Sequence, residues 1–362
     1  MSSTIGPPAM VAALLVGACR GEEPVPHATK HGIEAPSATS VQGVEIDPGI
    51  LSRYAPLPAV IESTVNPITD DKVALGRMLF YDTRLSKDHD VSCNTCHDLD
   101  RYGVDGKDVP SGHKGQKGRR NSPTVYNATL EFTEGWDGRA ETVEGQAKAH
   151  VLNPAEMAMP NSTRVVEAIE SVPEYVHAFE RAFPDDAHPV TFDNFAKAVG
   201  AFERKLVTPS RWDLFLTGDH AALTDDEKKG FLKFIDTGCV ACHVGPLVGG
   251  TMYQKLGVVK PWPNQTDKGR AEVTKSPSDE MVFKVSQLRN IEHTAPYSHD
   301  ASAKTLEQAV KMMAVYQLNK ELSDDDTQSI VTWLKTLSGP VPFDYVKKPD
   351  LPQSGSKLPK PK

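Results

Sequence analysis

Two copies of the pattern C-x-x-C-H constrain this chain more than any other feature of its sequence. The first copy reads C-N-T-C-H and the second C-V-A-C-H, and their functional residues are Cys93, Cys96 and His97, then Cys239, Cys242 and His243. Two thiols three positions apart reach the two vinyl groups on one edge of a haem, and the adjacent histidine reaches the iron as its proximal ligand. The pattern therefore predicts two covalently bound c-type haems.

Two other uses of paired cysteines stay open at this point. A four-cysteine zinc site has its two pairs about 15–20 residues apart, whereas these pairs lie more than 140 residues apart. A redox-active dithiol needs no histidine after its second cysteine. Both alternatives therefore fit the two motifs less well than haem does.

The chain is long enough for two domains and too acidic for a nucleic-acid-binding surface. It has 362 residues, 39% of them hydrophobic, and its 40 basic and 48 acidic side chains give a net charge of −8. A domain typically holds about 150 residues, and nucleic acid is usually bound by a basic surface. We therefore expect two domains and no nucleic-acid partner.

An apolar stretch at residues 8–18 leads into V-G-A-C, which ends at Cys19. It is too short to span a bilayer, but it fits a secretory signal peptide at residues 1–19, although no Lys or Arg precedes Arg20. Because haem is attached covalently outside the cytoplasmic membrane, we expect a periplasmic protein. Two interpretations of Cys19 stay open: a lipidated residue that anchors the chain to a membrane, or a residue of a discarded signal.

The patterns between the two ends predict a mainly α-helical fold. In residues 191–206, Phe192, Phe195, Val199 and Phe202 recur on one face at helical spacing. Further helices are expected to have as N-cap Asp70 or Asp71, Thr224 with a capping box to Glu227, Thr305 and Ser323, and helix ends are expected at Gly238 and Gly339.

Each haem motif follows a predicted helix and precedes a glycine-rich loop. This repeated order predicts two tandem cytochrome c-like domains, each with one haem, at residues 49–207 and 208–346. The flanking segments are rich in Pro, Ser and charged residues. They predict a flexible tether at residues 20–48 and a disordered tail at residues 347–362.

The residue on the other face of each iron separates an electron carrier from a peroxidase, because a carrier usually has two protein ligands and a peroxidase needs an open position. His113, in the glycine-rich loop S-G-H-K-G-Q-K-G, and Met313, on an apolar helix face, are candidate ligands. From the residues alone, a solvated loop histidine and a core methionine explain them equally well.

The chain resembles the bacterial di-haem cytochrome c peroxidases over nearly all of residues 72–340. The matching segments are L-G-R-M-L-F-Y-D-T-R-L-S, S-C-N-T-C-H-D-L, G-H-K-G-Q-K-G, R-N-S-P-T-V-Y-N-A, W-D-G-R-A-E-T, N-P-A-E-M, D-K-G-R, F-K-V-S-Q-L-R-N, T-A-P-Y-S-H-D and L-E-Q-A-V-K-M-M. So many motifs in order are more specific than two C-x-x-C-H elements, which multihaem electron carriers also have.

The resemblance implies a ligand set for each iron. His97 and His113 would be the axial pair of the N-terminal, low-potential haem, where peroxide is reduced. His243 and Met313 would be the pair of the C-terminal, high-potential haem, which receives electrons. This order agrees with the higher potential that thioether ligation confers.

The resemblance also implies three residues that act on electrons or peroxide. Trp136 would carry electrons between the haems, although Gly135 stands where the family usually has an aromatic residue. Gln146 and Glu156 would lie beside bound peroxide, where an amide can orient it and a carboxylate can move its proton. The alternatives are a buried structural Trp, a helix-surface amide and a surface glutamate. His150 stands where relatives more often have Gly-Pro, with no predicted effect.

A single Ca²⁺ between the domains is a further implication of the resemblance. Asn121 would supply its side-chain oxygen, and Thr294 and Pro296 their backbone carbonyls, which are the hard oxygen ligands that Ca²⁺ prefers. His299 matches a histidine near the domain interface. It would either join a redox-linked rearrangement there or serve as a hydrogen-bonded structural residue.

These implications predict an enzyme that reduces hydrogen peroxide with electrons from a small cytochrome c or cupredoxin, in a family whose members are typically homodimers. Reduction of the C-terminal haem would release His113 and open the N-terminal iron. Two other functions stay open. One is an oxidase that matures a quinone cofactor on a partner protein; such enzymes tend to have tyrosine in place of the methionine ligand, and Tyr316 is one turn from Met313. The other is a simple di-haem electron carrier.

Overall fold

The computed structural model describes residues 43–354 of the chain. The predicted signal peptide with Cys19, residues 20–42 of the predicted tether and residues 355–362 of the predicted tail lie outside the described residues. None of the helices within residues 43–354 has the length and apolar character that a membrane crossing requires.

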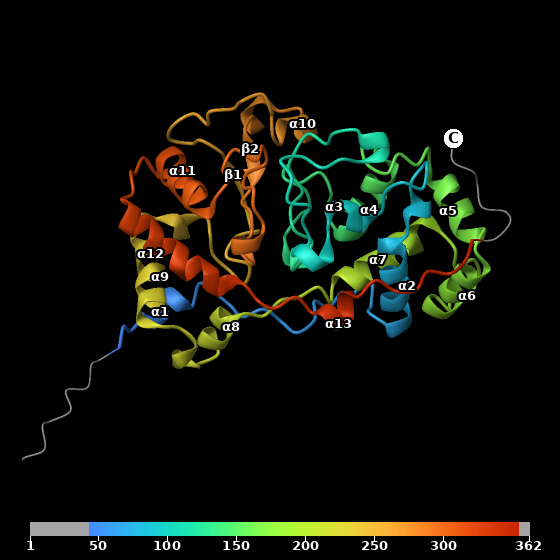
Figure 1. The fold of residues 1–362 in the computed structure, drawn as a ribbon, viewed down its shortest axis with the longest axis horizontal. Coiled ribbons are helices and arrows are strands. Elements are labelled where there is room, and N and C mark those ends of the chain that lie inside the picture. Colours follow the sequence, from blue (N-terminus) through green and yellow to red (C-terminus); the bar gives the residue numbers. More distant parts are fainter. Residues whose placement is uncertain (1–42, 355–362) are drawn as a thin grey trace, which may run out of the picture. The chain divides into compact units, whose positions relative to one another are not determined.

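α-Helices form most of the regular structure, which confirms the predicted fold class (Figure 1). The helices are α1 (Pro48–Leu51), α2 (Asp70–Tyr81), α3 (Cys93–Cys96), α4 (Val143–Leu152), α5 (Ser162–Glu170), α6 (Pro173–Ala182), α7 (Phe192–Glu203), α8 (Arg211–Leu216), α9 (Asp225–Thr237), α10 (Ala271–Thr274), α11 (Leu306–Leu318), α12 (Asp324–Leu334) and α13 (Phe343–Val346). Strands β1 (Tyr253–Lys255) and β2 (Val282–Lys284) pair antiparallel, with Tyr253 opposite Lys284.

A first hydrophobic core lies among α2, α4, α5, α6 and α7. The predicted apolar face of α7 forms part of it, since Phe195, Val199 and Phe202 are almost fully buried. α2 packs closely along α7 at Gly76, where a Cβ atom would lie only 1.9 Å from the carbonyl oxygen of Ala198. Glycine is therefore required for this helix pair, which supports the loop that carries the first haem motif.

A second hydrophobic core is built around α9 and α12. Trp212, Phe231 and Trp333 are fully buried in it, and the Phe231 ring lies with its centroid 4.9 Å from that of Trp212 and 5.0 Å from that of Trp333. Gly230 brings α9 close to α12, because a Cβ atom there would lie 2.1 Å from the carbonyl oxygen of Ser329. The second haem motif follows directly after α9.

The two ends of the described chain pack on the core that is distant in sequence. Ile46 and Tyr54, near the start, belong to the second core, whereas Val341 and Val346, near the end, belong to the first. Figure 1 accordingly shows α13 beside α2. The division into domains at residues 49–207 and 208–346 stays a prediction. Each core also includes a segment that lies on the other side of residue 207 in the sequence.

The helix caps that the sequence predicts most clearly are present in the structure. Thr224 and Glu227 form the predicted capping box at the start of α9, and Gly238 ends the helix in the left-handed conformation with φ +98°. Two predicted boundaries were wrong. Thr69, not Asp70 or Asp71, caps α2, because its side chain accepts from the Lys72 N–H; and α12 ends at Leu334 and continues as a 3-10 turn, so the helix does not extend to Gly339.

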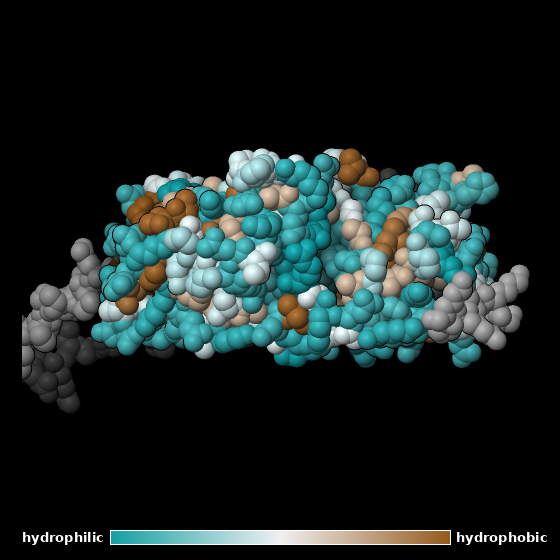
Figure 2. All heavy atoms as spheres, turned by 90° about the horizontal axis from the view of Figure 1, so that it is seen from above, coloured by the Kyte–Doolittle hydropathy of each residue, from teal (hydrophilic) through white to brown (hydrophobic). Residues whose placement is uncertain are grey.

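The start of the predicted disordered tail has definite contacts. Arg84 donates from Nη1 to the carbonyl oxygen of Pro352 (2.9 Å) and to the hydroxyl of Ser354 (3.2 Å). Pro352 and Ser354, two positions of the predicted disordered tail, are therefore held against Arg84. The surface elsewhere is mostly hydrophilic, and Figure 2 shows hydrophobic side chains in small separate groups on the face in view.

Candidate haem sites

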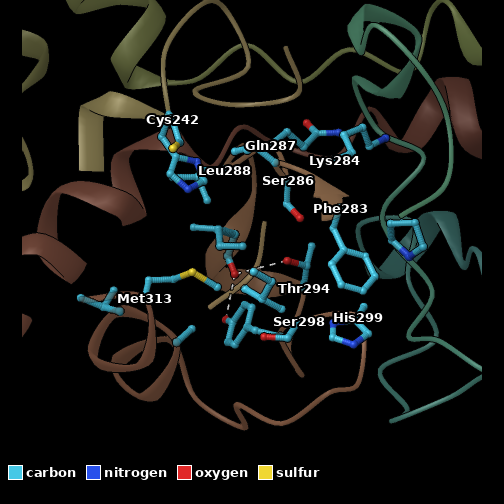
Figure 3. Close-up of a pocket in the computed structure, with 18 of the residues that line it drawn as sticks. Cys242, Phe283, Lys284, Ser286, Gln287, Leu288, Thr294, Ser298, His299 and Met313 are labelled. Atoms are coloured by element: carbon cyan, nitrogen blue, oxygen red, sulfur yellow. Dashed lines mark hydrogen bonds between the residues drawn. The ribbon is translucent and has the colours of Figure 1, made fainter. Parts of the chain in front are cut away.

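The second C-x-x-C-H motif opens onto a cavity with largely apolar walls. Gly238 turns the chain at the end of α9, and Cys239, Cys242 and His243 follow on the cavity wall. α11 contributes Met313 to the same cavity, and Figure 3 shows Met313 and Cys242 among the side chains that line it. The structure thus brings together the histidine and the methionine that the resemblance assigns to one iron.

The orientation of His243 suits a metal ligand. Its Nδ1 lies 3.1 Å from the carbonyl oxygen of Val248. Because a carbonyl oxygen only accepts, Nδ1 carries the proton and Nε2 is the nitrogen that can bind a metal. Burial lowers the pKa of His243, which keeps the imidazole neutral, as ligation requires.

The first motif repeats this arrangement. α3 carries Cys93 and Cys96, with Ser92 and Thr95 closing a capping box. His97 follows, and its Nδ1 lies 3.2 Å from the carbonyl oxygen of Gly103. Burial lowers the pKa of His97 to about 4, so this ring is also neutral with Nε2 available.

The four cysteines fit haem attachment better than a dithiol or zinc. All four are free thiols. Burial raises the pKa of Cys93 and of Cys239 to about 12 and that of Cys96 to about 11, whereas redox-active dithiols have lowered pKa values. Within residues 43–354 no three His, Cys, Asp or Glu side chains form a group that would hold a metal ion. Cys, His and apolar walls match the donor set of two c-type haems.

His113 lies in the glycine-rich loop with its imidazole between two carboxylates. Nδ1 is 3.3 Å from Asp90 Oδ1, and Nε2 is 3.8 Å from Asp88 Oδ2. The backbone N–H of His113 donates to the carbonyl oxygen of Glu156 (2.7 Å), which holds the loop against the segment after α4. Its assignment as an axial ligand stays a prediction.

Glu156 lies beside the first haem motif and has both carboxylate oxygens engaged. Oε2 accepts from His150 Nδ1, and Oε1 accepts from Asn153 Nδ2 at 2.8 Å. Burial by itself would raise the pKa of Glu156, but the charge and hydrogen bond of His150, with a smaller contribution from His97, hold it below its usual value. Glu156 is therefore an ionised, oriented carboxylate near His97.

Gln146 shares α4 with His150. The two positions are four apart, so they lie on one face of the helix, and the ring centroid of His150 lies 6.3 Å from that of His97. This places Gln146 on the helix face that is turned towards the first haem motif. Its predicted contact with peroxide stays a prediction.

Trp136 lies where the two halves of the chain meet. Its indole Nε1 donates to the carbonyl oxygen of Asn121 (2.8 Å), and its own carbonyl oxygen accepts from the Lys284 N–H (2.8 Å). Its ring packs against the cluster of Trp262, Met281 and Phe283 and lines the cavity of the second haem motif. A residue from the first half thus reaches the second haem site.

The three residues assigned to Ca²⁺ line this same cavity: Asn121, Thr294 and Pro296. The side-chain amide nitrogen of Asn121 donates to the Lys107 carbonyl oxygen (2.8 Å), which orients the opposite oxygen atom, Oδ1. His299 is buried nearby, stacked on Phe283 at 4.2 Å between ring centroids (Figure 3), and its Nε2 has no hydrogen-bond partner among the described residues. The role of His299, in a redox-linked rearrangement or as a hydrogen-bonded structural histidine, stays a prediction.

Sequence reasoning missed two features of these sites. One is His150, whose contact with Glu156 joins positions six apart; its presence in place of Gly-Pro was the available signal. The other is Arg120, which binds Asp267 with two hydrogen bonds (2.6 and 2.7 Å) and Asp137 with one (2.6 Å). No short-range pattern connects Arg120 to Asp267, so the sequence contained no sign of this pair.

Known proteins that resemble this chain are also di-haem proteins or peroxidases. The family model described as di-haem cytochrome c peroxidase matches residues 70–221. The cytochrome c551 peroxidase of Pseudomonas aeruginosa is 45% identical over 85% of this chain and 90% of its own, and that of Nitrosomonas europaea is 43% identical over 86% and 92%.

A solved structure extends the comparison to the whole fold. The crystal structure of a MauG-like protein associated with microbial copper homeostasis superposes with a TM-score of 0.70 at 27% identity, covering 81% of this chain and 97% of that one. The identity to the two peroxidases over most of both chains is high enough to establish common membership. The chain therefore belongs to the family of bacterial di-haem cytochrome c peroxidases, oxidoreductases with two c-type haem domains.

Proposed function

We propose that this protein reduces hydrogen peroxide to water at the haem of the first motif, with electrons that enter at the haem of the second. The observation that carries the proposal is the oriented, ionised Glu156 carboxylate beside His97. Family membership gives the reaction class, and an electron carrier has no use for such a carboxylate.

The reaction consumes one H₂O₂, two electrons and two protons and yields two molecules of water. The haem supplies the iron at which peroxide binds and electrons are exchanged. Glu156 accepts the proton from one peroxide oxygen and returns it to the other, which assists O–O cleavage. Gln146, on the same side, orients peroxide through its side-chain amide.

Electrons reach this site from the second motif. His243 and Met313 would hold the second haem, and both line the cavity that Trp136 also lines. Trp136 is bonded through its indole to Asn121, in the half of the chain that carries the first motif. Its ring therefore provides the path between the two sites.

A reductive gate regulates access to the first site. Peroxide would need an open position at the first haem, and His113 is the residue that would leave it, as the family resemblance implies. Asp88 and Asp90 give a released His113 a place to bind, because both of its ring nitrogens face their carboxylates.

The same region would hold a Ca²⁺ ion. Asn121 Oδ1 and the backbone carbonyls of Thr294 and Pro296 would be its protein ligands, with water completing the shell. Because the backbone carbonyl of Asn121 also accepts from Trp136, the ion would stabilise the segment on which the electron path depends.

The protein acts in the periplasm, with a small cytochrome c or cupredoxin as electron donor, and it forms a homodimer. Cys19 is either its lipid anchor or part of the discarded signal. Electron donors of this kind are proteins, and no nucleic acid takes part.

The test is steady-state oxidation of a reduced small cytochrome c by H₂O₂. The holoprotein is assayed fully oxidised and again after one-electron reduction. Fast turnover only after reduction supports peroxidase function and the gate together, and turnover in both states supports the peroxidase and removes the gate. Absence of turnover with every reduced donor, in protein with both haems intact, would overturn the proposal.

The second candidate is maturation of a quinone cofactor on a partner protein, by an enzyme that tends to have tyrosine in place of the methionine ligand. Met313 faces the cavity of the second motif, whereas Tyr316 packs its ring against Trp262 at 5.2 Å between centroids. The position of Met313 therefore favours the peroxidase.

A further inference from the structure

A buried lysine lies between two glutamates on the wall of the cavity of the second haem motif. Nζ of Lys284 contacts Oε2 of Glu131 and lies 4.0 Å from Oε2 of Glu134. It also donates to the carbonyl oxygen of Thr133 at 2.9 Å. The side chains of Lys284, Glu131 and Glu134, here called the Lys284 cluster, are only 7%, 7% and 5% exposed.

The Lys284 cluster contains one more carboxylate than ammonium group. With all three groups ionised it would carry one negative charge in a buried position, where an uncompensated charge is costly. One bound proton makes the cluster neutral. Burial raises the pKa of Glu134 well above its usual value and lowers the pKa of Lys284 to about 7. The proton equilibrium of the cluster as a whole therefore lies near neutral pH.

Other titratable and charged groups face the cluster from three elements: Glu144 on α4, Glu203 and Arg204 at the end of α7, and Tyr253 on β1 opposite Lys284. After burial, the charges of Glu203 and Glu144 raise the pKa of Glu134, whereas Arg204 opposes them. Arg204 binds Glu144 at 2.5 Å, and Tyr253 accepts from Arg270 at 2.6 Å. The surrounding carboxylates therefore strengthen proton binding by the cluster.

The cluster shares its cavity with the second haem motif. Lys284 and Glu131 line the cavity that His243 and Met313 also line, and Figure 3 labels Lys284 among these side chains. The backbone N–H of Lys284 donates to the carbonyl oxygen of Trp136 at 2.8 Å. Charges on a haem in this cavity and on the cluster interact through a largely apolar region, where water screens them weakly.

The charge of the cluster matches the change in charge that accompanies reduction of a haem. A ferric iron in a porphyrin has one positive charge more than a ferrous iron. The ionised cluster, with its net charge of −1, compensates the ferric state, and the neutral cluster with its bound proton suits the ferrous state. Each redox state therefore favours one protonation state, and the two equilibria are linked.

We propose that the Lys284 cluster binds one proton when the haem of the second motif is reduced and releases it when that haem is oxidised. The electron comes from the protein donor and converts ferric to ferrous iron. The proton comes from water and converts the Glu134 carboxylate to the carboxylic acid, so the net charge in the cavity is unchanged. The inference goes beyond peroxide reduction, because it requires only that a haem is bound at the second motif.

The test is the reduction potential of the second haem between pH 5 and 9, measured by spectroelectrochemical titration of the holoprotein. The step at higher potential is followed, as methionine ligation predicts for this haem. We expect the wild-type potential to fall as pH rises, by up to about 59 mV per pH unit, which corresponds to roughly a tenfold change in the equilibrium constant. Glu134→Gln and Glu131→Gln each remove the additional carboxylate, so either change should abolish most of this slope.

Glu280→Gln is the matched control, because Glu280 is an exposed carboxylate just before β2, 3.6 Å from Lys268. It should keep the wild-type slope. Glu203→Gln should keep the slope but move it to lower pH, because one of the charges that raise the pKa of Glu134 is removed. A wild-type slope in both Glu134→Gln and Glu131→Gln, or loss of the slope in Glu203→Gln alone, would overturn the inference.

Proton uptake by the wild-type protein provides a second measurement that needs no variant. A pH indicator in weakly buffered solution follows uptake during electrochemical reduction of the second haem. We expect uptake near neutral pH, and its absence would overturn the inference. Peroxidase turnover is measured separately, so a protein that fails to reduce peroxide but takes up the proton would count against the proposed function and not against the Lys284 cluster.

Discussion

Arg120 and Asp267 join segments that are 147 positions apart through two parallel hydrogen bonds, Nε to Oδ2 at 2.6 Å and Nη2 to Oδ1 at 2.7 Å. Both side chains are about nine-tenths buried, at 10% exposure each. Nη1 of Arg120 also binds Asp137, next to Trp136. The pair thus ties the proposed electron path to the loop that precedes α10.

Replacing the charged acceptor of this pair should destabilise the protein. We expect Asp267→Asn to lower the free energy of unfolding of the holoprotein by about 1.5–3 kcal/mol at pH 7, the usual value for hydrogen bonds to charged groups. Asp108→Asn removes the partner of Lys304 in an exposed pair (2.5 Å) and should cost no more than about 1 kcal/mol. Urea unfolding measures the free energy of unfolding of both variants. Equal losses would mean that burial does not strengthen the Arg120–Asp267 pair.

The contribution of Asp267 should disappear in acid. Burial by itself would raise the pKa of Asp267, but the hydrogen bonds and charge of Arg120 and the Gly269 N–H hold it below the usual value. A lowered pKa stabilises the fold above the unfolded pKa, near 4, and this stabilisation is lost as pH falls through the folded value. The difference between wild type and Asp267→Asn should therefore be constant from pH 7 to 5 and shrink below pH 4.

Glu203 at the end of α7 should have the opposite pH dependence. Burial, and after it the charge of Glu144, raises the pKa of Glu203 to about 8. The unfolded chain ionises this group above its usual value near 4.5, so the free energy of unfolding falls as pH rises from 5 to 8. Glu203→Gln should remove this dependence and gain roughly 1–3 kcal/mol over wild type at pH 8. The exposed Glu167→Gln is the control, and an unchanged pH profile in Glu203→Gln would show the assignment to be wrong.

Gly138 should not tolerate a side chain. Its φ is +66°, and a Cβ atom would lie 1.8 Å from the hydroxyl oxygen of Tyr253. Gly115 has a similar φ of +73° but no atom of the described residues within 4 Å of that position. Gly115→Ala should cost about 1–2 kcal/mol for the left-handed backbone alone, and Gly138→Ala about 1–3 kcal/mol more for the overlap. Thermal unfolding compares the stability of the two variants. Equal losses of stability would mean that Tyr253 moves aside without cost.

Glu156→Gln should reduce kcat/KM for peroxide by about 10²- to 10⁴-fold, the range for loss of a general acid–base group. The amide keeps the size of the side chain but cannot accept a proton. Stopped-flow reaction of the reduced enzyme with H₂O₂ measures the change, again with Glu167→Gln as control. Full turnover in Glu156→Gln would remove Glu156 from the mechanism.

Trp136→Phe should slow electron delivery to the first haem by about tenfold, an increase in barrier of about 1.4 kcal/mol. Trp262→Phe is a matched control, because that indole also donates a hydrogen bond, to Asp300 at 3.2 Å, but its ring does not line the cavity. Rapid-scan absorption of both haems follows the transfer. Equal rates in the two variants would mean that electrons take another path.

Features whose contacts are local could be predicted from the sequence alone. A haem motif needs two thiols and a histidine within five positions, and the caps at Thr224 and Thr305 need a partner three positions away. Such contacts depend on backbone geometry over one turn, which the residue types specify directly. For this reason the haem motifs, the helical fold class and the helix starts with a clear capping residue, such as Thr224 and Thr305, follow from the order of the residues.

Long-range contacts, in contrast, are set by the tertiary structure. His150 and His97 are 53 positions apart, Arg120 and Asp267 are 147 apart, and each end of the described residues packs on the core that is distant from it in sequence. The packing of α4, α7 and α9 determines which histidines and carboxylates come into contact. That packing depends on the shapes and the burial of many side chains at once. No short segment of the sequence specifies this packing, so these contacts could be identified only in the folded chain.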